Sequence, residues 1–102
     1  MSDRLVLPDR LDYTTRLEFT TNASRVIEHA HAEIEVDCSA IAIVDDSTVG
    51  MLVWLTRNAR RRGLPVVLDN PPSRLLQALE AAGVSDRFQP RTDVVTPERE
   101  TG

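Results

Sequence analysis

The sequence predicts a small α/β domain: a mostly parallel or mixed β-sheet of about four strands with about three to four helices. Apolar runs of strand length alternate along the chain with segments whose apolar residues recur at helical spacing. The 102 residues suffice for one domain with one modest core. Because parallel strands need crossover connections and helices supply them, the repeated strand–helix order favours parallel pairing. We expect residues 1–90 to form the domain and the polar residues 91–102 to form a disordered tail.

The first strand and helix are expected near the N-terminus. Leu5–Leu7 is a short apolar run that Pro8 ends. From Thr15 to about His29, apolar residues repeat at the spacing of an amphipathic helix. Thr15 and Glu18 have the spacing of a capping box, so we expect the Thr15 side chain to cap this helix.

The central segment from Glu33 to Val44 is predicted to be one buried strand, because it begins with alternating residues and ends in an apolar run. Asp45-Asp46-Ser47-Thr48 follows, and such short oxygen-bearing side chains accept hydrogen bonds from the free N–H groups of a helix's first turn. The next helix is almost wholly apolar at first and should end at Gly63. Trp54 lies in its apolar part and is expected in the core; if exposed, it becomes an interface anchor.

The last third of the chain predicts one more strand and helix. Leu64–Asp69 is apolar enough to be buried on both faces of a sheet. Asn70–Ser73 should start a helix, because its prolines suit a first turn, and Gly83 should end it. The segment from Val84 to Gln89 is expected to add a short edge strand.

Composition excludes several functional classes. The net charge of −4 argues against a nucleic-acid partner, which a basic surface would favour. The chain contains no lysine, so a Walker-type nucleotide site lacks its phosphate-binding residue. No apolar run approaches the ~20 residues of a membrane span, so we expect no membrane insertion. The N-terminus lacks the apolar core of a signal peptide, which predicts a cytoplasmic location. Cys38 should be a small buried hydrophobe, and we expect no zinc site at the two histidines, His29 and His31.

Acidic residues follow several of the apolar runs, and arginines precede Gly63. Asp12, Asp45, Asp46 and Asp69 each follow an apolar run, and the carboxyl ends of strands are where sites gather in open α/β sheets. Together they could hold Mg²⁺ in an enzyme, but the absence of a lysine, a histidine acid–base pair and a glycine-rich loop disfavours that class. We therefore expect no catalytic residue, no metal and no cofactor. The arginines before Gly63 suit the helix dipole, or else contact an acidic partner.

The spacing of several short motifs resembles that of the STAS domain of bacterial anti-sigma factor antagonists. Asp45 lies eight residues after Asp37, as the family's motif aspartate does after its earlier one. The match runs without a gap from Val36 to Val84, and with Leu11-Asp12 it covers about four-fifths of the chain. The matching segments are Val36-Asp37-Cys38-Ser39, Asp45, Val49-Gly50, Gly63, Asn70-Pro71 and Gly83-Val84.

The resemblance implies a non-enzymatic protein-binding module that regulates transcription by partner switching. In such antagonists the unphosphorylated domain binds an anti-sigma factor that is also its serine kinase, and phosphate on the serine after the motif aspartate abolishes binding through its charge. Asp46 stands at that phosphoacceptor position here. Shifting the alignment by one residue would place Ser47 there, but it would break the match at Val49-Gly50.

The partner-binding residues that the resemblance implies are Asp45, Asp46, Ser47, Thr48 and Val49, with Ser47 or Thr48 as a residual phosphosite. Simple capping of a helix is compatible with this role. An alternative is a STAS subunit of another assembly, such as a lipid-transport ABC transporter, where it docks on the ATPase subunit, or a chemotaxis or stress complex.

Overall fold

The computed structural model of the chain describes residues 4–92 and confirms the predicted α/β fold. Four strands form one sheet in the order β1-β2-β3-β4, and every pair is parallel. The strands are β1 (Arg4–Val6), β2 (Ile34–Asp37), β3 (Val66–Asp69) and β4 (Phe88–Arg91). The helices are α1 (Arg16–His29), α2 (Asp46–Arg60) and α3 (Ser73–Ala81), with a short 3₁₀ turn η1 (Ser85–Arg87) before β4.

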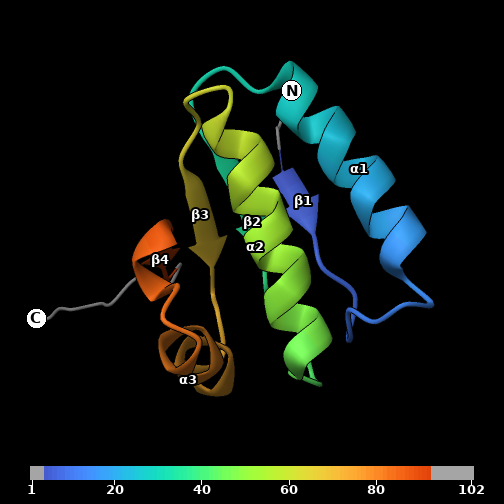
Figure 1. Cartoon of the computed structure of the whole chain (residues 1–102), viewed down its shortest axis with the longest axis vertical. Helices are drawn as coiled ribbons and strands as arrows, with labels where there is room; N and C mark the ends of the chain where they lie inside the picture. Colours follow the sequence, from blue (N-terminus) through green and yellow to red (C-terminus); the bar gives the residue numbers. More distant parts are fainter. Residues whose placement is uncertain (1–3, 93–102) are drawn as a thin grey trace, which may run out of the picture.

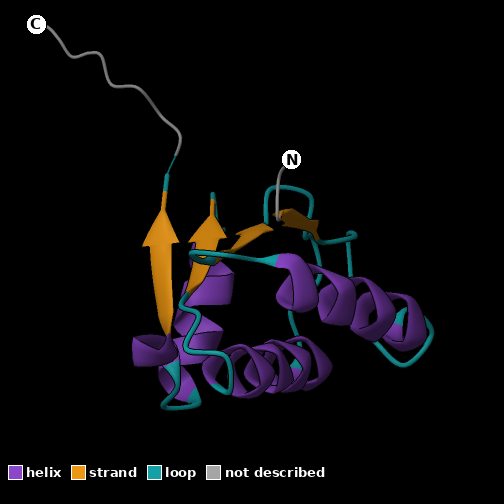
Figure 2. Cartoon of the chain, turned by 90° about the horizontal axis from the view of Figure 1, so that it is seen from above, coloured by secondary structure: helices purple, strands orange, loops and turns teal. Residues whose placement is uncertain are grey.

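The helices pack on one face of the sheet. Figures 1 and 2 show α1 and α2 side by side on that face. The core joins the inward side chains of the strands to the apolar stripes of all three helices, including Phe19 of α1, Leu52 of α2 and Leu75 of α3. Strand residues alternate, so Ile34 and Val36 enter this core while their neighbours point to the opposite face. We call that opposite side of the sheet the helix-free face.

Helices α2 and α3 are each followed by a glycine with a positive φ angle. Gly63 and Gly83 have φ angles of 70° and 75°, a region that glycine enters without the usual steric penalty. The N–H of Leu64 donates to the carbonyl of Ala59 at 3.0 Å, which closes a Schellman motif past the end of α2. The corresponding bond past the end of α3 runs from Val84 to the Leu79 carbonyl. The predicted helix stops are therefore confirmed.

The prediction of one strand from Glu33 to Val44 is wrong. β2 ends at Asp37, and the chain leaves the sheet after the N–H of Cys38 donates to the Asp69 carbonyl. It meets the segment after β1 again at Ala42 and Ile43, through hydrogen bonds to the Asp9 carbonyl and an isolated bridge. The Asp37 carboxylate accepts hydrogen bonds from the backbone N–H and the hydroxyl of Ser39, at 3.0 and 2.7 Å. This local turn competes with the sheet ladder and takes the chain out of the sheet.

The capping box predicted at Thr15 and Glu18 is also wrong. The Thr15 hydroxyl makes no bond to the first turn of α1. It accepts from the N–H of Asp12 at 3.0 Å, and the Asp12 carboxylate accepts from the N–H of Thr14 at 2.9 Å. Asp12 thus organises the turn before α1, and the Thr15 side chain points back into that turn.

At the other end of the chain, Arg91, which was expected in the tail, is the last residue of β4. Residues 93–102 lie outside the described residues.

Candidate functional site

The N-terminus of α2 has the capping arrangement that the sequence predicts. Asp45 is the N-cap residue, and its carboxylate accepts from the N–H of Thr48 at 3.2 Å. The Thr48 hydroxyl accepts from the N–H of Asp45 at 3.2 Å, so the capping box is reciprocal. Together these bonds satisfy one N–H of the first turn and the N–H of the cap residue itself, which fixes the loop's entry into the helix.

The five predicted partner-binding residues divide by exposure. Asp45, Asp46 and Ser47 are exposed, Val49 is half-buried against the core, and Thr48 is fully buried. The Thr48 hydroxyl is therefore enclosed within the cap, whereas Ser47 presents its hydroxyl to solvent. Asp46 adds a negative charge to the first turn of α2, where the helix dipole favours it.

A hollow of about 280 Å³ lies beside this turn, between α1 and α2. Trp54 is half-buried there and meets the Phe19 ring edge to face, with 6.2 Å between ring centroids. The prediction that Trp54 belongs to the core thus holds for one side of its ring, while the rest faces the hollow. Tyr13, which sequence reasoning passed over, also lines the hollow, and 85% of it is exposed.

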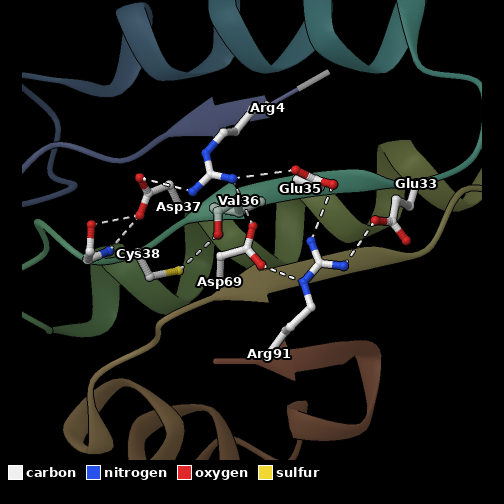
Figure 3. A network of polar contacts seen from close by, with 9 residues as sticks. Arg4, Glu33, Glu35, Val36, Asp37, Cys38, Asp69 and Arg91 are labelled. Atoms are coloured by element: carbon white, nitrogen blue, oxygen red, sulfur yellow. Dashed lines mark hydrogen bonds and ion pairs between the residues drawn. The ribbon is translucent and has the colours of Figure 1, made fainter. Parts of the chain in front are cut away.

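The helix-free face carries a network of ion pairs, drawn in Figure 3. At its centre is Asp69, which is only 1% exposed. Its carboxylate accepts from Nε of Arg91 at 2.7 Å and lies 3.4 Å from a guanidinium nitrogen of Arg4. The buried aspartate is therefore paired by arginines from both edge strands, as the cost of burying a charge requires.

Carboxylates of the central strand β2 complete this network. Glu35 lies 3.5 Å from Arg4 and 3.3 Å from Arg91, and Asp37 lies 3.3 Å from Arg4. The hydrogen bond to Asp69 is the main cause that raises the pKa of Arg91. Hydrogen bonds from the Ser39 backbone and hydroxyl, with a smaller contribution from Arg4, lower the pKa of Asp37. The network therefore connects all four strands from β1 to β4.

The acids at the ends of apolar segments do not assemble into a metal site in the described part of the chain. Within residues 4–92, no group of three or more His, Cys, Asp or Glu side chains is placed to hold a metal ion. Asp69 is paired with arginines, Asp12 organises its own turn, and Asp45 caps α2.

Cys38 is buried, and burial raises the pKa of its thiol to about 12. No helix among the described residues is long and apolar enough to cross a membrane.

These features define a one-sided parallel α/β domain that presents the capped, acidic first turn of a central helix. The sequence model of the family described as "Mlab, STAS domain" matches residues 2–96. The chain therefore belongs to the STAS domain family, which confirms the resemblance found in its motifs. A crystal structure of a candidate anti-sigma factor antagonist from Thermotoga maritima has a TM-score of 0.73 and 14% identity, covering 93% of this chain and 83% of that one. At this identity the likeness shows the shared fold. No curated protein matches the chain in sequence.

Proposed function

We propose that this chain is a non-enzymatic protein-binding STAS module of the anti-sigma factor antagonist type, which acts in the cytoplasm and docks a partner through the first turn of α2. The observation that carries the proposal is the exposed pair Asp46–Ser47 on a turn held rigid by the capping box of Asp45 and Thr48. A rigid, exposed turn presents its side chains to a partner without an ordering cost. Val49, half-buried below it, supports the same surface.

Asp46 gives the proposed switch a permanent charge. A phosphoserine adds a charge of about −1.5 to −2 that a phosphatase can remove, whereas an aspartate carries one negative charge at all times. A serine kinase cannot phosphorylate Asp46, so this position no longer responds to it. We propose Ser47 as the residual phosphosite of the turn, because its hydroxyl is exposed while that of Thr48 is buried.

The test is a titration of the purified chain against each anti-sigma kinase encoded in the same genome, with and without ATP. We expect one of them to bind and ATP to leave the affinity unchanged for the Ser47→Ala variant. Replacing Asp46 by serine in that variant should create an acceptor, so that ATP then releases the complex and mass spectrometry finds phosphate on the new serine. Asp86→Ser, on exposed η1, is the matched control. Failure of every kinase to bind, in either condition, would refute the proposal.

A second candidate is a STAS subunit of another assembly, such as a lipid-transport ABC transporter. The observation that favours keeping it is the description of the matched family, "Mlab, STAS domain", which is not that of an anti-sigma factor antagonist. Co-purification of the tagged chain with an ATPase subunit, and with no kinase, would support this candidate over the first.

A further inference from the structure

The hollow beside the first turn of α2 has the features of a surface that another protein covers. Tyr13, which is 85% exposed, lines it, and Leu17, which is 78% exposed, lies in the first turn of α1 outside this lining. A large exposed aromatic side chain on a recess that also contains Trp54 is a common mark of an interaction site. The residues lining this hollow are Tyr13, Arg16, Thr20, Ser47, Gly50, Met51 and Trp54.

Gly50 provides an independent sign that this recess is used. It lies inside α2, where glycine weakens a helix compared with alanine. A Cβ atom placed at Gly50 would have no atom within 4 Å, so packing within the fold does not require glycine there. The missing side chain instead keeps the hollow open and exposes the backbone of α2 to a close approach from outside.

A second hollow, of about 380 Å³, lies further along the same two helices. Thr20 and Ser24 are one turn apart on α1, as are Trp54 and Asn58 on α2, so the two hollows follow one another between the helices. We call the two together the α1–α2 groove. The second hollow is lined by Ser24, Ile27, Glu28, Asn58, Arg61 and Arg62.

The first hollow holds the apolar surfaces of Met51 and Trp54 with one arginine, and the second holds two arginines, Arg61 and Arg62, with one acid, Glu28. Arg61 is exposed at the end of α2 and lines the second hollow, and Arg57, exposed one turn before it, lies outside the lining of both hollows. Within the described residues neither of them forms an ion pair, whereas Arg4 and Arg91 on the helix-free face each pair with three carboxylates. In a chain whose net charge is −4, these unpaired cations form a local positive surface that is complementary to an acidic segment.

We propose that the α1–α2 groove receives an acidic amphipathic helix of the protein partner. An apolar side chain of that helix would fill the hollow at Gly50, and carboxylates would face Arg57 and Arg61. Arg57 and Arg61 lie seven and eleven residues beyond Gly50 on α2, or roughly 10 and 16 Å along a helix axis. A partner helix lying along the groove therefore carries its acids two to three turns from its apolar anchor. This inference rests on the proposed protein-binding function and extends its surface from the first turn of α2 to the full length of the helix.

The experiment measures the affinity of each anti-sigma kinase or ATPase subunit that binds the wild-type chain, by calorimetry and by the emission of Trp54, the only tryptophan. Gly50→Gln fills the first hollow and should weaken binding by about tenfold or more. Gly50→Ala adds one methyl group and should change binding by less than about threefold. Both should melt no lower than the wild type, because glycine is the poorer helix former.

Arg61→Glu tests the basic end, and its exposed position keeps this result independent of folding at Gly50. It should weaken binding about tenfold and reduce the salt dependence of the affinity. Arg87→Glu, the same charge change on η1, should change binding by less than about threefold. If a partner binds the wild type, and both Gly50→Gln and Arg61→Glu bind it as well as the wild type does, the groove is refuted while the proposed function stands. If no candidate binds the wild type, the proposed function is refuted and this inference with it.

Discussion

Asp69 is the residue whose replacement best tests the physical account of the sheet. It is 1% exposed, and it pairs with Arg91 at 2.7 Å and with Arg4 at 3.4 Å. The substitution Asp69→Asn keeps the shape of the side chain and removes its charge. The asparagine amide can still accept a hydrogen bond, but its NH₂ group would face guanidinium groups that only donate.

The expected loss follows from the burial of this carboxylate. Removing one partner of a buried ion pair costs ~3–5 kcal/mol, and a hydrogen bond to a charged group contributes ~1.5–3 kcal/mol. The two guanidinium groups are partly exposed and keep other carboxylates nearby, so the lower part of these ranges applies. We expect Asp69→Asn to lower the free energy of unfolding by about 2–3 kcal/mol. For a domain of this size that corresponds to a fall in Tm of about 10–20 °C.

The assay is thermal and urea unfolding followed by circular dichroism at pH 7. Asp86→Asn, the same chemical change at an exposed position of η1, is the control and should shift Tm by less than about 3 °C. If Asp69→Asn shifts Tm no more than this control does, or raises it, then the ion pairs of the helix-free face contribute no net stability and our reasoning about the buried carboxylate is wrong.

Three other predictions concern the cap, the thiol and the response to acid. Asp45→Ala should lower the free energy of unfolding by about 1 kcal/mol in urea titrations, since it removes the cap of α2; an unchanged midpoint would contradict the capping role. Cys38 should not react with Ellman's reagent at pH 8 in the native state, because its pKa is raised to about 12, and should react fully in urea; fast native labelling would show that the thiol is accessible. The folded-state pKa of Asp37 is lowered, so its stabilisation is present above its unfolded pKa and is lost as the pH falls through the folded value. Ser39→Ala removes the hydroxyl hydrogen bond to Asp37 and leaves the pKa of that carboxyl less depressed, so the variant should have the lower Tm at pH 6 and the difference should shrink as the pH falls to 2.5; a difference that stays constant with pH would contradict this.

Local interactions explain why much of the fold can be predicted from sequence. The cap at Asp45 involves residues three apart, and the stops at Gly63 and Gly83 depend on a backbone conformation that glycine adopts readily. The same local chemistry caused two of the errors, the long central strand and the capping box of α1. The Asp12 carboxylate binds the backbone of the turn before α1, and the capping box predicted from spacing does not form there. The Asp37 carboxylate binds the backbone of Ser39, and β2 ends there although the apolar pattern predicted a longer strand.

By itself, the sequence determined the order of strands and helices and the cap of α2, because these depend on residues within one or two turns of one another. Only the tertiary structure decided that all helices cover one face, that Arg4 and Arg91 meet at the buried Asp69, and that Tyr13 and Trp54 border one hollow. Those contacts join segments far apart in the chain, and residue spacing along a sequence carries no information about which distant side chains share a face of the sheet or a groove between helices.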